Sequence, residues 1–387
     1  MIDASGRGRF AQYAAADRPK ARICIPTGRR FNNTASRCGL YEAQDVFASL
    51  DEVDVLPLES GVAFEWKQNL QRRLLRRDFT KGLIHVNPGI KQIRLTQDYE
   101  LLIVMCQQWY ELLYLNAIQD WRSHCKVAIC WLDELWAHQL YKHPSWLHAL
   151  DQFDHILVGL SGTVAVLSKI LGRQCHHMPL AVDVLRFSPY PLPPARVIDV
   201  LSIGRRWEGV HRALLEMAKT EGTFYVHDTV VDAGDMRLKE LAQHRDMLAN
   251  MSKRSRFFFV GAAKMDHPEE TSGQLEFGSR YFEGAAAGSV LIGQVPDCEA
   301  FRALFDWAEV IIPIKPDGSD VRDVLRSLDE QPKHLQDIGM RNVASSARRH
   351  DWMYRWQKIL QIAGISPTTA LDRRAAQLEA LVKAAQP

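Results

Sequence analysis

A short segment of the chain holds two carboxylates and an arginine beside residues that can start a helix. Glu276 and Glu283 flank Arg280, and both Gly278 and Ser279 suit the position before a first helical turn. The unpaired backbone N–H groups at a helix N-terminus attract phosphate. Carboxylates beside them accept hydrogen bonds from sugar hydroxyls. The segment therefore has groups suited to both ends of a phosphate-linked sugar.

The flanking sequence places this segment between two buried strands. The apolar runs 257–260 and 290–292 predict strands, and the helix between them is expected to end at Gly288. A purely structural interpretation is also open. The small residues 284–288 suit any helix packed closely on a sheet, and Glu283 in a first turn complements the helix dipole.

Composition bounds the class of protein. At 387 residues the chain is long for one hydrophobic core, so two domains are expected. A formal net charge of +2 gives no global basic field, so nucleic acid is not an expected partner. The seven cysteines form no CxxC pair, which favours reduced thiols in a cytoplasmic protein and no metal site. The most apolar window, 101–118, is too polar and too short to span a bilayer.

Segments typical of strands and helices alternate along the whole chain. The expected strands lie at 22–26, 53–57, 101–105, 126–132, 155–159, 199–203, 223–227, 256–260, 290–292 and 310–313. The expected helices include 41–50, 109–123, 164–171, 210–220, 235–251, 279–287, 320–330 and 332–349. This alternation predicts an α/β fold of two Rossmann-like domains with parallel sheets that face each other across a cleft. Ligands of such sheets bind at the carboxyl ends of the strands, which makes the cleft the expected site.

A proline-rich stretch at 187–194 marks the boundary between the two halves. It has four prolines in six residues, which cannot continue a helix or a central strand. The expected divisions are residues 1–188, residues 189–349 and a terminal helical segment at 350–387.

The second half resembles the donor-binding domain of retaining GT-B glycosyltransferases of family four (group 1) and of spore-coat-glycosyltransferase-like proteins. The matching pieces, in order, are 179–183 with 186–189, the strand and basic loop at 199–206, the glutamate motif at 276–288, the late strand at 310–313 with Asp317, and Trp352. The resemblance covers about 178–360 and implies the GT-B fold. It also implies that the helix around Trp352 returns toward the first domain.

The resemblance implies a reaction and a set of donor-binding residues. The reaction is sugar transfer from a UDP- or GDP-linked donor with retention of configuration, without a metal and with the leaving phosphate as the base. Glu283 would bind the ribose, Glu276 would contact the donor sugar, and Arg205 would stabilise the departing diphosphate. The backbone N–H groups from Gly278 to Tyr281, with Ser279 and Arg280 between them, and the neighbouring Arg206 complete this set.

Two departures from the family pattern motivate an alternative. Glu276 and Glu283 are seven positions apart where the pattern has eight, and no lysine follows Arg205, although Arg206, Arg212 or Arg280 can supply that charge. The alternative is a non-catalytic GT-B-like binding or assembly protein. A nicotinamide oxidoreductase is disfavoured, because no GxGxxG follows a predicted strand.

The first half is expected to supply the acceptor side, with a glycan, lipid-linked or small-molecule acceptor. Asp133 and Glu134 follow an apolar strand, so either carboxylate could orient an acceptor hydroxyl, while Asp133 is equally suited to cap a helix. Gly28, after the first strand, permits close approach of a ligand.

The segment 65–81 combines arginines with a repeating apolar stripe. Trp66, Leu70 and Leu74 recur every four residues, as in a helix that lies on an anionic membrane surface. This predicts a peripheral contact with the inner face of the membrane, suited to a lipid-linked acceptor. The alternative is a surface helix whose stripe packs on its own domain.

Overall fold

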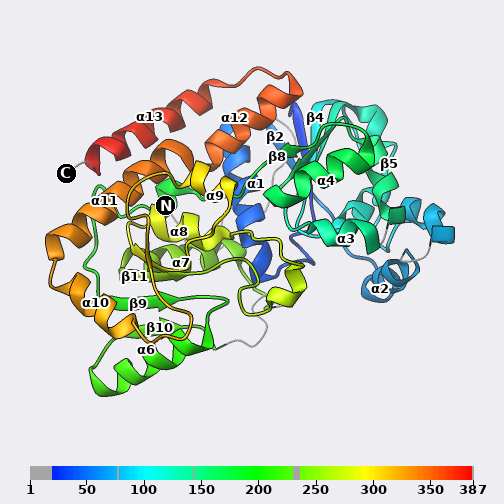
Figure 1. Cartoon of the computed structure of the whole chain (residues 1–387). Helices are drawn as coiled ribbons and strands as arrows, with labels where there is room; N and C mark the ends of the chain where they lie inside the picture. Colours follow the sequence, from blue (N-terminus) through cyan, green and yellow to red (C-terminus); the bar gives the residue numbers. More distant parts are fainter. Residues whose placement is uncertain (1–19, 76–77, 143, 230–235, 386–387) are drawn as a thin grey trace.

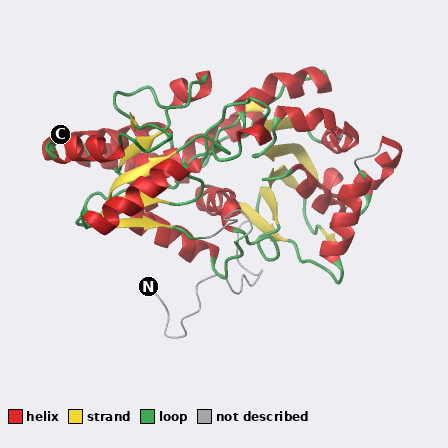
Figure 2. Cartoon of the chain, turned by 60° about the horizontal axis from the view of Figure 1, so that its bottom comes forward, coloured by secondary structure: helices red, strands yellow, loops and turns green. Residues whose placement is uncertain are grey.

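The computed structural model describes residues 20–75, 78–142, 144–229 and 236–385, and it contains two α/β domains (Figure 1). The first domain has a six-stranded parallel sheet in the order β2-β1-β4-β6-β7-β8, and the second a five-stranded parallel sheet in the order β10-β9-β11-β12-β13. The predicted α/β class with two parallel sheets is confirmed. Helices flank both sheets in the two views of the chain (Figure 1, Figure 2).

All the strands of the two sheets except β8 lie close to segments that the sequence predicts. Those of the first sheet are β1 (Ile23–Thr27), β2 (Val53–Pro57), β4 (Tyr99–Cys106), β6 (Cys125–Leu132), β7 (His155–Val158) and β8 (His176–His177). Those of the second sheet are β9 (Ile198–Ser202), β10 (Tyr225–His227), β11 (Ser255–Val260), β12 (Val290–Gly293) and β13 (Ile311–Pro313). The central strands are apolar on both faces because helices cover both sides of a parallel sheet.

The helices connect the strands and close the chain. In the first domain and the linker they are α1 (Cys38–Leu50), α2 (Phe64–Leu74), α3 (Ala137–Lys142), α4 (Ser161–Leu171) and α5 (Val184–Phe187). The second domain has α6 (Glu208–Thr220), α7 (Leu241–Lys253), α8 (Ser279–Ala286), α9 (Glu299–Leu304), α10 (Val321–Asp329) and α11 (Pro332–Arg349). The last two helices are α12 (Trp352–Ala363) and α13 (Thr369–Ala384). No helix in the described ranges combines the length and the apolar character needed to cross a bilayer.

The helix predicted at 109–123 is wrong. The segment forms two 3₁₀ stretches, Trp109–Ala117 and Trp121–His124, separated by the short strand β5 (Ile118–Gln119), which pairs with β3 (Ile93–Arg94). Asp120 adopts a left-handed φ of 49°, which an α-helix cannot accommodate.

Two other predicted segments include residues outside the described part of the chain. Residue 235 of the helix predicted at 235–251 is one of them, and the observed helix α7 spans Leu241–Lys253. Residues 76 and 77 of the basic segment 65–81 also lie outside the described ranges.

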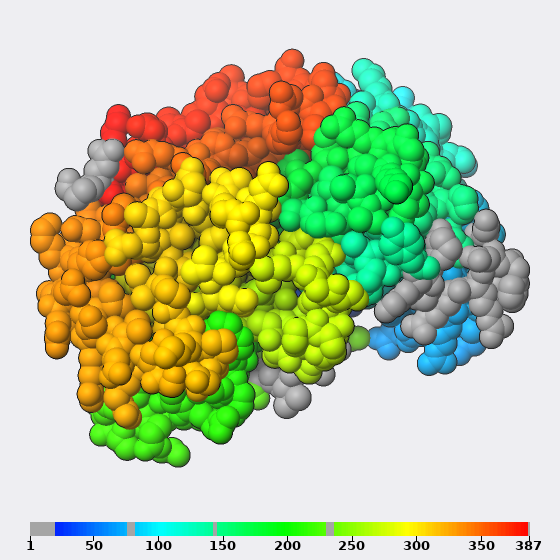
Figure 3. Space-filling view, viewed as in Figure 1, coloured from blue at the N-terminus to red at the C-terminus, as the bar shows by residue number. Residues whose placement is uncertain are grey.

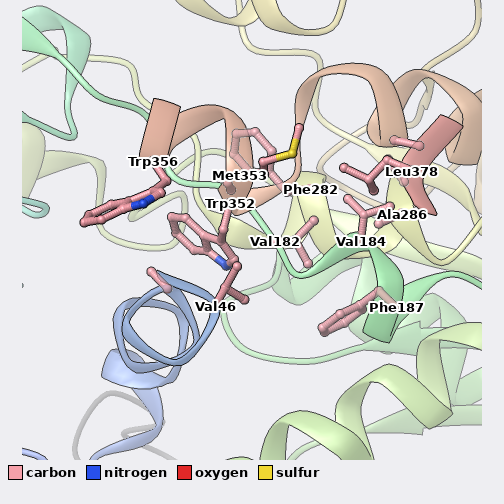
Figure 4. Packing of buried hydrophobic residues seen from close by; sticks show 14 of the residues in the cluster. Val46, Val182, Val184, Phe187, Phe282, Ala286, Trp352, Met353, Trp356 and Leu378 are labelled. Atoms are coloured by element: carbon pink, nitrogen blue, oxygen red, sulfur yellow. The ribbon is translucent and has the colours of Figure 1, made fainter. Parts of the chain in front are cut away.

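Helix α12 crosses from the second domain and packs on α1 of the first (Figure 4). Trp352 and Trp356 are fully buried, and the ring of Trp356 stacks on that of Phe47 with the centroids 4.6 Å apart. The end of the chain therefore completes a hydrophobic core shared by the two domains. The boundary at 188–189 stays a prediction, and it falls in the segment between β8 and β9.

Candidate functional site

Helix α8 begins directly after the loop that follows β11. Gly278 precedes it in an extended conformation, and no side chain caps the helix. Among the described residues, no acceptor pairs with the N–H groups of Ser279, Arg280 or Tyr281. The Tyr281 side chain is buried and donates to the carbonyl of Gln294 at 2.9 Å, so only its backbone faces the site.

Close packing of α8 on the sheet fixes where its N-terminus lies. A methyl group at Gly284 would lie 2.5 Å from Cδ2 of Leu291 on β12, so only glycine permits this approach. Gly288 follows the helix with a φ of 65°, a conformation that favours glycine. The small residues that suggested tight packing therefore have that role, and the same packing positions the helix tip.

The N-terminus of α8 lines a cavity between the two domains. Ser279, Arg280 and Glu283 contribute from the second domain, and residues 38–40 and Asp133 contribute from the first. The cavity lies where the carboxyl ends of the two sets of parallel strands face each other, which is the usual ligand position in such folds. The structure therefore brings one predicted acceptor-side residue together with three predicted donor-side residues.

Glu283 is fully buried and ion-paired on both carboxylate oxygens. Arg245 donates to Oε1 and Arg280 donates to Oε2. Burial opposes ionisation, but the charges of Arg280 and Arg245 outweigh it and hold the pKa of Glu283 at about 2. The Arg280 side chain is 31% exposed and that of Arg245 only 5%, so Arg280 is the partner of Glu283 that is more accessible to solvent.

Arg280 lies between the helix tip and the first loop of the second sheet. Its Nε donates to the carbonyl of Ile203 at 3.0 Å, at the end of β9. Gly204 follows with a φ of 90°, and a methyl group there would lie 3.8 Å from the same Nε. The guanidinium therefore stands beside the N–H groups of α8, where it can meet an anion.

The other arginines of this region are held elsewhere. Arg205 pairs with Asp266 at 2.6 Å and is half exposed, and Arg206 pairs with Asp228 at 2.8 Å. Arg212 lies on the exposed face of α6. None of the three lines the interdomain cavity in the described structure.

Asp133 follows β6 and faces the same cavity from the first domain. Burial, together with the charges of Glu134 and Glu111, raises the pKa of Asp133 to about 8. The next helix, α3, begins at Ala137, four residues later, so Asp133 does not occupy its N-cap position. A carboxyl group that titrates near neutral pH in a cleft is typical of a functional position.

A comparison with known protein families matches part of the chain. Residues 199–361 match the family model described as "Glycosyl transferase-like". These residues form a glycosyl transferase-like domain. None of the curated proteins matches the sequence.

Solved structures extend the likeness beyond this domain. The chain is similar to an alpha-glucosyltransferase in complex with UDP (TM-score 0.55) and to an alpha-glucosyltransferase in complex with UDP-glucose and DNA containing an abasic site (TM-score 0.53). Each shares 10% identity and covers 89% of this chain and 99% of its own. At this identity the likeness shows the fold, which is GT-B.

Glu276 of the glycosyl transferase-like domain does not line the cavity. Its carboxylate accepts hydrogen bonds from the backbone N–H groups of Gly162 at 2.7 Å and Ser161 at 3.2 Å, at the start of α4 in the other domain. Gln274, in the same loop, accepts from the N–H of Ala137 at 3.0 Å. The loop after β11 therefore binds the opposite domain, and these two lobes meet in the space-filling view (Figure 3).

The remaining acceptor-side candidates lie outside the interdomain cavity. Glu134 accepts from the indole of Trp136 and from the amides of two glutamines. Gly28 lines a separate small cavity in the first domain, beside the buried ion pair between Arg37 and Glu111.

Sequence reasoning missed two residues that form a chain of ion pairs with Glu283, Glu42 and Arg245. Both are buried, and both pair with each other across the domain interface. A signal was present, because Glu42 shares the apolar stripe of α1 with Val46 and Leu50. A charge within an apolar stripe indicates a buried ion pair.

Proposed function

We propose that the chain is a glycosyltransferase that moves a sugar from a UDP- or GDP-linked donor to a glycan, lipid-linked or small-molecule acceptor. The observation that carries the proposal is the N-terminus of α8, which has no partner among the described residues and opens on a cavity shared with Asp133 of the other domain. A helix N-terminus with an adjacent arginine suits a diphosphate, and a carboxylate one turn later suits a ribose.

Each group has one role in the proposed reaction. The bond between the anomeric carbon and the diphosphate oxygen breaks, and its electron pair passes to the diphosphate, which Arg280 and the N–H groups of α8 stabilise. The acceptor oxygen attacks the same face, and its proton passes to the leaving phosphate. Asp133 orients the acceptor hydroxyl, and Glu283 holds the ribose. Arg205 reaches the diphosphate after leaving Asp266, and Glu276 reaches the donor sugar after leaving α4.

The first test is nucleotide binding. UDP or GDP is expected to raise the melting temperature, because a ligand at about 100 times its Kd adds about 2.7 kcal/mol of stability. Glu283→Gln should remove that increase. Glu111→Gln is the matched control, since Glu111 is also a buried carboxylate paired with an arginine, and it should retain the increase. If neither nucleotide shifts the melting of the unaltered protein, the proposal fails.

Turnover separates the enzyme from the non-catalytic alternative. A panel of UDP- and GDP-sugars, followed by mass spectrometry, should reveal release or transfer of one sugar. Binding without any turnover would favour a binding or assembly protein. The anomeric configuration of the product, measured by NMR, tests retention, and an inverted product would make Asp133 the base that deprotonates the acceptor.

The outer face of α2 suits the surface of an anionic bilayer. Trp66 and Leu70 of the predicted stripe are 65% and 41% exposed, whereas Leu74 is half-buried, and Val62, just before the helix, is 95% exposed. The first two positions of the stripe therefore face solvent. Lys67 and Arg73 are exposed beside it. Apolar and cationic side chains on one helix face bind the interface of anionic membranes. We propose that this face presents the first domain to a lipid-linked acceptor.

Vesicle binding tests this surface. Trp66→Ser with Leu70→Ser should lower co-sedimentation with vesicles that contain phosphatidylglycerol by about tenfold or more, the loss expected for two buried apolar side chains. Tyr141→Ser is the control, because Tyr141 is 70% exposed elsewhere on the domain. Equal sedimentation of all the variants would contradict the membrane contact.

A further inference from the structure

A buried chain of charges crosses the domain interface behind Glu283. Arg245 of α7 donates from Nε and Nη2 to the two carboxylate oxygens of Glu42 on α1, at 3.0 and 2.9 Å. Its remaining terminal nitrogen, Nη1, donates to Glu283. The three side chains are 5% exposed or less.

Glu42 also accepts hydrogen bonds from α12 and from the segment that links the two domains. Its Oε2 also accepts from the indole of Trp352 on α12 and from the backbone N–H of Asp183, both at 3.0 Å. Arg186 donates to Oε1 at 3.3 Å. A carboxylate with this many donors is fixed in place, and it fixes the guanidinium of Arg245 in turn.

The geometry of a guanidinium determines how much of Glu283 stays available. The five N–H donors of arginine form a rigid planar fork, so two nitrogens held by Glu42 leave one directed at Glu283. Arg245 therefore donates a hydrogen bond to only one oxygen of Glu283, Oε1. The other oxygen is held by Arg280, the more exposed arginine that lines the cavity. Without Glu42, Arg245 would turn and bind both oxygens of Glu283.

We propose that Glu42 is a positioning residue for the nucleotide. It holds Arg245 so that Glu283 keeps an oxygen free for a ribose hydroxyl once Arg280 turns to the diphosphate. The inference rests on the proposed role of Glu283. If Glu42 has this role, the affinity of the second domain for its nucleotide depends on a residue of the first domain.

The test measures the Kd of UDP and of its 2′-deoxy and 3′-deoxy analogues by calorimetry, with the GDP series if GDP binds better. The unaltered protein should bind the nucleotide that has both ribose hydroxyls more tightly than either deoxy analogue. Glu42→Gln should weaken UDP binding about tenfold, equal to about 1.4 kcal/mol, and should abolish that preference. A purely structural loss would weaken all three ligands equally.

Asp51→Asn is the matched control. Asp51 is also a buried carboxylate that pairs with an arginine, Arg22, and accepts from a tryptophan of α12, Trp356. Both variants should melt at lower temperature, but Asp51→Asn should keep the affinity for UDP and the preference for complete hydroxyls. If Glu42→Gln does not fold, Arg245→Lys replaces it, since lysine keeps the charge without the fork.

The outcomes separate this inference from the proposed function. Equal weakening of all three ligands in Glu42→Gln, or no weakening, overturns the positioning role alone. Failure of the unaltered protein to bind either UDP or GDP overturns the nucleotide site and the positioning role with it.

Discussion

Replacing Arg280 with alanine is expected to lower kcat for sugar transfer on the order of 10²–10³-fold, the usual cost of removing one donor that stabilises developing negative charge. Arg280 lies in the first turn of α8, and it lines the interdomain cavity. Its loss leaves the departing diphosphate with only the helix tip and Arg205. Steady-state kinetics with the donor found in the panel provide the measurement.

Two further variants show whether the charge of Arg280 is what matters. Arg280→Lys should recover part of the rate, because it keeps a cation at the tip. Arg212→Ala should behave as wild type, since Arg212 is 74% exposed on α6 and pairs with Glu208 on the same helix. An Arg280→Ala enzyme with an unchanged kcat would show that the diphosphate lies elsewhere.

Asp133→Asn is expected to reduce transfer on the order of 10²-fold at pH above 8 and to flatten the pH profile. The ionised carboxylate accepts a hydrogen bond from the acceptor hydroxyl more strongly than the protonated acid does, and the pKa of Asp133 is raised to about 8. The rate of the unaltered enzyme should therefore rise with pH and level off above 8. A profile in Asp133→Asn that still rises through the same range would assign the titration to another group.

The same substitution should stabilise the protein in alkaline solution. The ordinary pKa of the aspartate is 3.8, so between that value and about 8 the unfolded chain loses the proton that the folded protein keeps. Stability then falls as pH rises through this window, by up to about 1.36 kcal/mol for each pKa unit. An asparagine side chain at this position has no such proton to lose. The melting temperature of Asp133→Asn should exceed that of the unaltered protein at pH 8, and the two should converge near pH 4.

The arrangement of strands was predictable because it depends on local patterns. Apolar runs bounded by turn residues indicate the strands of both sheets, and Gly288 correctly marks the end of α8. The segment 109–123 misled because its apolar residues fit a helix, while the left-handed turn at Asp120 depends on the pairing of β5 with β3. A backbone conformation that depends on pairing with another strand cannot be predicted from the local sequence alone.

The site residues that lie in one segment were predictable from the sequence. The contacts between residues of the two domains were not. Ser279, Arg280 and Glu283 share one helix, so their spacing alone brings them together. Arg245 and Glu42 are far apart in the sequence, and only the closed interface places them in contact. Glu276 likewise finds its partners on α4, in the opposite domain.

Helix α12 packs on α1 but is synthesised long after it. The indoles of Trp352 and Trp356 cover Phe47 and α1, but the ribosome synthesises them more than 300 residues after Glu42. The early half of a nascent chain emerges without this cover, and exposed apolar surface invites association with other chains. The first lobe therefore reaches its final packing only after α12 has been synthesised, and a stop before codon 352 would leave α1 without the two indoles that cover it.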